Sequence, residues 1–194
     1  MFKPFFHPLR QALLNYVPSN VAPASMISSV QRGQITIPAD QLSADATIPS
    51  VNLSSSLLLH LFYIDPLYAT LRYLNTHLEL INPTTVRASR YFQDGTHSHT
   101  VGFSVVEFNP FFINSVQSGQ IDLISGFSSE TATITAVDLD KSFISHLGLC
   151  RGVDSFNTSN YFAAVELLNS TTVRATRGGT SFTLEVFYSV IEAK

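Results

Sequence analysis

The chain has 194 residues, of which only 13 % are charged, and its formal net charge is −3. The absence of a basic face argues against a nucleic-acid-binding protein, and no run of about 18 apolar residues could form a transmembrane helix. A single cysteine, Cys150, excludes an intrachain disulfide and a thiolate metal site, and its apolar neighbours predict a small core residue. The low charge and the many Ser and Thr residues favour a β protein whose surface is partly covered by partners over an ordinary secreted β domain.

The first 28 residues predict an arm and linker that stand apart from the rest of the chain. Pro8 suits the first turn of a short helix that ends at Pro18, and so short a helix is marginal alone in water. We expect the arm to be retained in the mature protein, because prolines and Arg10 interrupt any secretory core region. We also expect it to cross to a neighbouring subunit. Its candidate interface residues are Phe2, Phe5, Phe6, Leu9, Leu13 and Val17.

The remainder of the chain contains an internal repeat. Ser29–Ile35 returns as Ser115–Ile121, and Leu78–Arg90 returns as Val165–Arg177, at a shift of about 86 positions that drifts by about one residue. Small loop insertions produce such a drift, so we infer that one folding unit has been duplicated. The predicted organisation is an arm and linker at 1–28, a first β unit at 29–110 and a second β unit at 111–194.

Within each unit the hydrophobic pattern has the period of a β-strand. Polar and apolar residues alternate over Gln34–Ile37, Thr131–Val137 and Thr183–Val190. The continuous apolar run Leu57–Ile64 predicts a central strand that is covered on both faces. About five or six strands per unit predict an all-β chain of two tandem, homologous small β-sandwiches with Greek-key-like connections.

Each unit is also predicted to contain one hairpin at equivalent positions. Asn82–Thr85 and Asn169–Thr172 lie between apolar runs and have the composition of turns. In the two hairpins, the alternation of apolar and polar residues predicts four side chains that point into the core. These are Leu80, Val86, Leu167 and Val173.

Histidines stand out in two places. His60 and His146 match in the two units, which favours a hydrogen-bonded core histidine or an interface contact. His97 and His99 stand two residues apart and could supply two ligands to a metal. Because no carboxylate partner beyond Asp94 is evident, we predict a solvated loop at this position and no metal site.

Arginines recur in the hairpins, where Arg87 and Arg90 match Arg174 and Arg177. Glu79 could pair across its hairpin to Arg87 or Arg90, and such cross-strand pairs contribute up to about 1 kcal/mol each. These pairs could simply fix the register of the hairpin, or the arginines could form ion pairs with a neighbouring subunit. All four arginines are therefore candidate interface residues.

No catalytic motif is evident in the sequence. It has no Gly-rich phosphate loop between a strand and a helix, no nucleophile elbow and no helix with zinc-ligand spacing. The spacing of acids and hydroxyls does not single out a triad. We predict a protein that is not an enzyme and has no catalytic residue and no cofactor.

Four motifs carry a family resemblance: Ser29–Ile37, Ala132–Asp138 followed by Lys141-Ser142, Thr171–Arg177 and Phe103–Phe108. Together they resemble a short β-repeat found in virion proteins of tailed bacteriophages. The resemblance covers nearly all of residues 29 to 193. The second unit fits its middle better, because the first has Pro49 where the second has Thr135. The resemblance implies a structural, non-catalytic role, and it carries over no binding residues.

These observations predict a bacteriophage virion structural protein, capsid-associated as a decoration or head-fibre base protein. We expect a homo-oligomer that contacts other virion proteins in the virion, after assembly in the host cytoplasm, without nucleic-acid or membrane partners. A tail or connector component is the alternative within this class. A receptor- or carbohydrate-binding module of a tail fibre is a further alternative, although Trp is absent. Its sugar-stacking candidates are Tyr63, Tyr68, Tyr73 and Tyr161.

Overall fold

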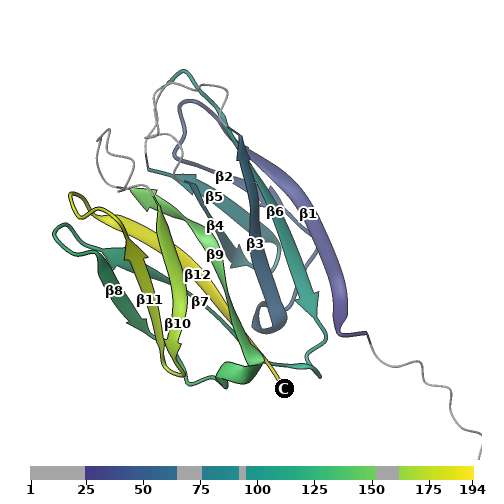
Figure 1. Ribbon diagram of the computed structural model, residues 1–194. Helices are drawn as coiled ribbons and strands as arrows, with labels where there is room; N and C mark the ends of the chain where they lie inside the picture. Colours follow the sequence, from purple (N-terminus) through teal and green to yellow (C-terminus); the bar gives the residue numbers. More distant parts are fainter. Residues whose placement is uncertain (1–24, 65–75, 92–94, 152–161) are drawn as a thin grey trace, which may run out of the picture.

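The computed structural model describes residues 25–64, 76–91, 95–151 and 162–194 of the chain, and these residues form twelve β-strands (Figure 1). The first half contains β1 (Ile27–Ile37), β2 (Ser43–Thr47), β3 (Ser56–Ile64), β4 (Thr76–Asn82), β5 (Thr85–Arg90) and β6 (His99–Phe108). The second half contains β7 (Ile113–Leu123), β8 (Ser129–Thr133), β9 (Ser142–Arg151), β10 (Ala163–Asn169), β11 (Thr172–Arg177) and β12 (Leu184–Ala193). Short 3₁₀ turns, η2 (Leu53–Ser55) and η4 (Leu139–Lys141), precede β3 and β9. The predicted arm helix and its candidate residues lie outside the described residues.

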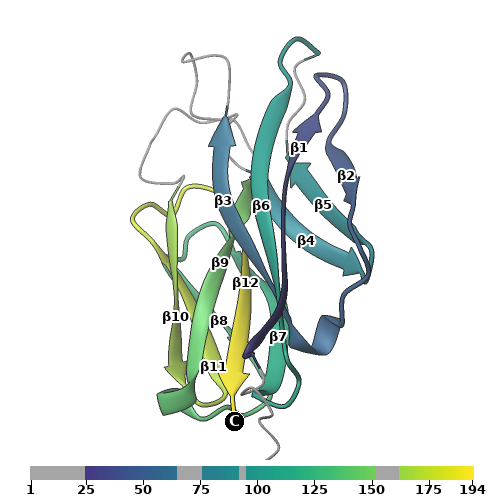
Figure 2. The same cartoon turned by 90° about the vertical axis from the view of Figure 1, so that its right-hand side faces the viewer.

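Each half is a sandwich of two antiparallel three-stranded layers (Figures 1 and 2). In the first half β1-β6-β3 packs on β2-β5-β4, and in the second half β7-β12-β9 packs on β8-β11-β10. Strand β4 also meets β9, which joins one layer of each half into a six-stranded sheet with the order β2-β5-β4-β9-β12-β7. The predicted all-β sandwich architecture is confirmed.

The same local contacts recur in the two halves. The Asn82 side chain accepts a hydrogen bond from the Thr84 N–H at 2.9 Å, and Asn169 accepts one from Thr171 at 2.9 Å. The hairpins turn between Asn82 and Thr85 and between Asn169 and Thr172, as predicted. A duplication would leave such matched contacts, and the duplication itself stays an inference from the sequence repeat.

A second matched contact differs in one hydrogen bond. In the second half, the Gln117 amide donates to the Thr135 carbonyl at 3.0 Å and accepts from the Thr135 N–H at 2.8 Å. In the first half, Gln31 donates to the Pro49 carbonyl at 3.0 Å, but its own carbonyl oxygen is buried without a partner. The reason is that proline has no backbone N–H to offer.

One hydrophobic core lies within each half, and the core of the first half also includes Leu147, Cys150 and Phe187 of the second half. Val86 and Val173 are fully buried in matching places, and Leu80 and Leu167 are partly buried and pack against the two cores. The predicted core positions of Val86 and Val173 are therefore confirmed, whereas Leu80 and Leu167 lie at the margins of the two cores. Burial of a Val or Leu side chain stabilises the fold by roughly 1.5–3 kcal/mol. Cys150 is also buried, as its apolar neighbours predicted.

The prediction of a central strand at Leu57–Ile64 is wrong, because β3 lies at the edge of its sheet. Its first residues are nevertheless covered on both faces. Leu57 packs against Ile113 and Ile191 of the second half, which cover the outer face of β3 near its start. Towards its end, at Ile64, the strand is exposed. The apolar residues at the start of β3 are thus explained by contact with the second half and not by a central position of the strand in its sheet.

The prediction of a solvated loop is wrong for His99. This side chain is fully buried at the start of β6, and its Nδ1 lies 3.2 Å from the hydroxyl of Tyr63. The two rings meet edge to face, with centroids 5.4 Å apart. His97 is partly exposed in the preceding turn, where its Nδ1 lies 2.8 Å from the Thr96 hydroxyl.

Candidate functional site at the junction of the two halves

The two halves meet at one close backbone contact, where His77 of β4 pairs with Gly148 of β9. Gly148 has φ +108°, in the region that only glycine adopts freely. A Cβ at this position would lie 2.1 Å from the Thr76 carbonyl oxygen and 2.7 Å from the Cα of His77. The absence of a side chain at Gly148 is therefore what allows the two strands to come together.

An aromatic stack lies beside this contact. The imidazole of His77 is parallel to the phenyl ring of Phe187 in β12, with a 3.7 Å centroid separation and a 1° interplanar angle. The same imidazole places its Nε2 3.4 Å from a carboxylate oxygen of Glu79. His77 is buried, so the junction carries a buried ring held from both halves.

His60 and His146 complete a cluster of three histidines at the junction. The Nε2 of His60 lies 3.4 Å from the Thr76 hydroxyl, and the Nδ1 of His146 accepts a hydrogen bond from the Gly148 N–H at 3.0 Å. These contacts fit the prediction that the repeated histidines are hydrogen-bonded or at an interface. Sequence reasoning gave no role to the third member, His77.

Burial holds all three imidazoles in the neutral form. It lowers the pKa of His60 to about 4, and the nearby charges that His146 and His77 would carry lower it further. Burial also lowers the pKa of His146. For His77 burial lowers the pKa more than the Glu79 carboxylate raises it. At neutral pH the cluster is therefore uncharged.

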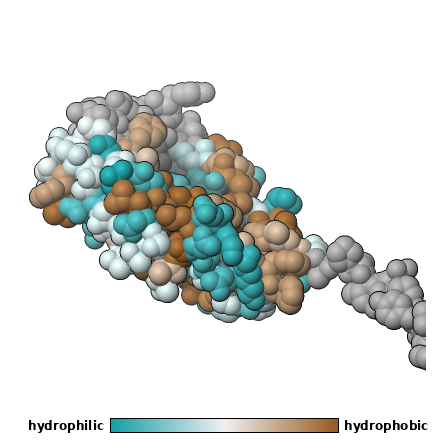
Figure 3. Space-filling view, turned by 60° about the horizontal axis from the view of Figure 1, so that its bottom comes forward, coloured by the Kyte–Doolittle hydropathy of each residue, from teal (hydrophilic) through white to brown (hydrophobic). Residues whose placement is uncertain are grey.

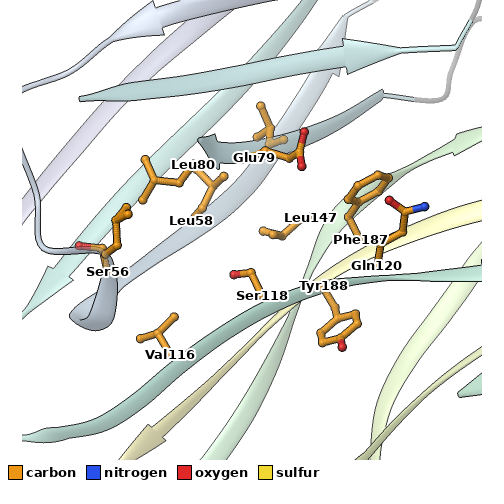
Figure 4. A pocket seen from close by; sticks show the side chains of 13 residues that line it. Ser56, Leu58, Glu79, Leu80, Val116, Ser118, Gln120, Leu147, Phe187 and Tyr188 are labelled. Carbon is orange, nitrogen blue, oxygen red and sulfur yellow. The ribbon is translucent and has the colours of Figure 1, made fainter. Parts of the chain in front are cut away.

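A cavity of about 380 Å³ opens at the junction, between β3 and β4 of the first half and β7, β9 and β12 of the second (Figure 4). Leu58 and Leu80 line one side, and Val116 and Ser118 line the other. Glu79 is the single charged residue among those that line it. The cavity is thus lined by both polar and apolar side chains, with Glu79 as the carboxylate among them.

Glu79 faces this cavity because the arginine opposite it has another partner. The hairpin register places Glu79 opposite Arg87, but Arg87 forms two hydrogen bonds with Asp45 of β2, at 2.7 and 2.9 Å. In the second half Thr131 stands opposite Arg174 in place of an aspartate. Arg174 accordingly pairs with the counterpart of Glu79, Glu166, at 2.6 Å. Both ion pairs are exposed, so water and salt screen them and neither pair stabilises the fold much.

The other two candidate arginines serve the interior of their own halves. Arg90 and Arg177 are buried. Arg90 donates to the carbonyls of Pro38, Ala39, Gln41 and His97, at 2.7 to 3.0 Å. Arg177 donates to the carbonyls of Ile124, Phe127 and Phe182. Each guanidinium thus ties two loops of its half together, which leaves Arg87 and Arg174 as the exposed interface candidates.

The sequence did contain a signal for the junction at the positions where the repeats differ. In the first half the ring of Phe62 in β3 lies over Gly102 of β6, and a Cβ at Gly102 would be 2.2 Å from that ring. In the second half, Gly148 of β9 stands at the position of Phe62, and Phe187 of β12 stands at the position of Gly102. The aromatic residue and the glycine have therefore exchanged strands. Alignment of the two repeats would have identified this exchange.

No protein-family model, curated protein or solved structure matches this chain. Among the described residues, no group of three or more His, Cys, Asp or Glu side chains is arranged to hold a metal ion. Within the same residues, no helix has the length and apolar character needed to cross a bilayer. Of the tyrosines considered for sugar stacking, Tyr63 is partly buried beside His99. The others, Tyr68, Tyr73 and Tyr161, lie outside the described residues.

Proposed function

We propose that this protein is a non-enzymatic structural protein of a tailed-bacteriophage virion. It would be associated with the capsid as a decoration or head-fibre base protein. The proposal is supported by the repeat resemblance, the low charge and the double sandwich. The observation that carries it is a group of exposed apolar side chains at one end of the molecule, since such groups mark interaction surfaces.

This base patch consists of Met26, Ile27 and Phe111, all of which are exposed. Phe111 is 75 % exposed, the highest value among the large apolar side chains of the described chain. The Asn109 N–H donates to the Met26 carbonyl at 2.9 Å, which holds the start of β1 beside the β6–β7 turn. Figure 3, which brings this end forward, shows apolar side chains where the described chain begins.

The arm adjoins the base patch, because the described chain begins at Ser25, directly before Met26. Its apolar residues, from Phe2 to Val17, would extend the contact made by the patch. Burial of each such side chain is worth roughly 1.5–3 kcal/mol, which exceeds the ordering cost of about 0.5–1.5 kcal/mol per side chain. The arm and the patch together would attach the double sandwich to a capsid subunit.

Two variants test this function in phage particles that lack the wild-type protein. Deletion of residues 1–20 should leave the thermal unfolding of the β domains unchanged and abolish incorporation into particles. Phe111→Ser should weaken incorporation, whereas Phe127→Ser, at another exposed aromatic residue, should not. Normal incorporation of the truncated protein would refute the role of the arm. A low-resolution map of the intact particle would then separate a capsid position from a tail or connector position.

A further inference from the structure

The junction joins surfaces that are not equivalent in the two repeats. The first half contributes β4, whose counterpart is β10, and the second half contributes β9, whose counterpart is β3. A contact of this kind is head-to-tail: it uses one surface of each half and leaves the matching surface of the other half unused. We propose that the unused surfaces bind a second copy of this chain, with β10 of one copy against β3 of the next. The proposal stands independently of a virion role.

Four surfaces are defined by matched residues. The β4 surface is Thr76 and His77 of β4 together with Leu57 of β3, and the β9 surface is Leu147 and Cys150 of β9 together with Ile113 of β7. Their unused counterparts are the β10 surface, Ala163 and Ala164 of β10 together with Phe143 of β9, and the β3 surface, Leu61 and Ile64 of β3 together with Ile27 of β1. None of these twelve residues is an acid, a lysine or an arginine.

Burial separates the β4 surface from the β10 surface. Leu57 is 2 % exposed, because the second half covers it, whereas its counterpart Phe143 is 52 % exposed. His77 is buried under Phe187, whereas Ala164 at the matched position of β10 is exposed. The β10 surface of the second half thus corresponds to the β4 surface of the first half, but no described residue packs over Phe143 and Ala164 in the way that the second half packs over Leu57 and His77.

The β9 and β3 surfaces differ in the same way. Leu147 and Cys150 are 3 % and 5 % exposed, and both belong to the core that includes Leu58 and Leu78 of the first half. Their counterparts Leu61 and Ile64 are 48 % and 55 % exposed. A bulge at Leu61 in β3 is matched by one at Leu147 in β9, so the two strands share this irregularity at the same position of the repeat.

At the close contact, the junction combines a large side chain from β4 with a glycine of β9. The proposed contact would combine a small side chain from β10 with a large one of β3. In the junction the large His77 faces Gly148. In the proposed contact the small Ala164 would face Phe62, whose ring lies over Gly102. No residue other than glycine has positive φ in the described chain, so Phe62 does not share the backbone of Gly148. Strand β10 would therefore rest on the Phe62 ring and not directly on the β3 backbone, with Ala164 leaving room for that ring.

The position of the strands agrees with this docking. Both β3 and β10 are the outermost strands of their three-stranded layers, so each has one edge without a strand partner among the described residues. Unpaired edges with apolar side chains are sites of association in β proteins. Because the contact is head-to-tail, repeated docking would close into a ring or extend as a filament, according to the rotation between copies.

Sedimentation velocity of the full chain tests the proposal. We expect species larger than a monomer as the concentration rises towards about 1 mM, the effective concentration that a short flexible linker gives to a tethered pair. Ile64→Glu removes the β3 surface, and Phe143→Glu removes the β10 surface. Each variant alone should stay monomeric, with unchanged thermal unfolding because both side chains are exposed. A mixture of the two should form one-to-one dimers and nothing larger, since one intact surface of each kind remains.

Ile81→Glu is the matched control. Ile81 and its counterpart Leu168 are both exposed, so this position is outside the junction and the variant should associate like the wild type. A monomer at every concentration would overturn the proposal. Association that Ile64→Glu and Phe143→Glu leave unchanged would also overturn it, as would a mixture of the two variants that grows beyond dimers. None of these results depends on incorporation into particles, so they leave the proposed virion function to its own test.

Discussion

The imidazole of His77 and the phenyl ring of Phe187 lie parallel across the two halves of the chain, with centroids 3.7 Å apart. Both rings are buried, so the stack stabilises the contact between the halves through the apolar area that it removes from water. The stack adjoins Gly148, where the two halves approach most closely. The halves are thus joined by specific packing between buried groups, and several consequences of this packing can be measured.

Gly148→Ala should destabilise the junction by at least about 2 kcal/mol. The new Cβ would lie 2.1 Å from the Thr76 carbonyl oxygen, and alanine is strained at φ +108°. Calorimetry should show a lower unfolding temperature, or two separate transitions if the halves come apart. The control is Gly95→Ala, at φ +72° with no atom within 4 Å, which carries the backbone strain alone. Equal unfolding temperatures of the two variants would contradict the steric account.

Folding stability should decrease as the pH falls through the range in which histidines titrate. The pKa of His60 is 6.5 in the unfolded chain and about 4 in the folded one, so below pH 6.5 the unfolded state binds its proton first. The stability is therefore constant above about pH 6.5 and decreases towards pH 4, by on the order of 3 kcal/mol for His60. His77 and His146 act in the same direction, and the carboxylate of Glu79 opposes the effect at His77.

Denaturant unfolding of the wild type and of His60→Gln, across this pH range, measures the effect. The variant should lose less stability on acidification, because glutamine does not bind a proton. Parallel pH dependences of the two proteins would show that His60 does not contribute.

Val173→Asp should unfold the second half. Val173 is fully buried in its core, and a carboxylate there would be without a partner, which costs several kcal/mol. Leu168→Asp, at an exposed position of the neighbouring strand β10, is the control and should change stability by less than about 0.5 kcal/mol. Circular dichroism and thermal unfolding compare the two. A Val173→Asp protein that melts like the wild type would contradict the inward phase of β11.

Exchange of proline and threonine at the partners of Gln117 and Gln31 should have unequal effects on stability. Thr135→Pro removes the backbone N–H that donates a hydrogen bond to the Gln117 side chain at 2.8 Å. The free energy of unfolding should decrease by about 1–3 kcal/mol. Pro49→Thr gives the buried oxygen of Gln31 a donor, a gain offset by about 0.4–1 kcal/mol from the freer unfolded chain. Its net effect should therefore be small. Denaturant midpoints of both variants test the difference, and a Thr135→Pro protein as stable as the wild type would rule out the hydrogen bond as its source.

Local features of the fold could be predicted from the sequence because local physics produces them. A period of two places alternate side chains on opposite faces of a strand, and this placed Val86 and Val173 in the cores. The Asx contacts of Asn82 and Asn169 are made within two residues, so the turns could be read from composition. The burial of Cys150 followed from its apolar neighbours. None of these features depends on where the other half of the chain lies.

The junction was decided only by the tertiary structure. The apolar run of β3 indicated burial on two faces, but not that the second half supplies the cover for Leu57. Glu79 stands opposite Arg87 in the hairpin register, yet the approach of Asp45 from β2 takes that arginine away and leaves Glu79 beside His77. A sequence pattern indicates that a side chain is buried or has a partner. Which partner buries or pairs it depends on contacts between distant segments, and these are chosen by the packing of the whole chain.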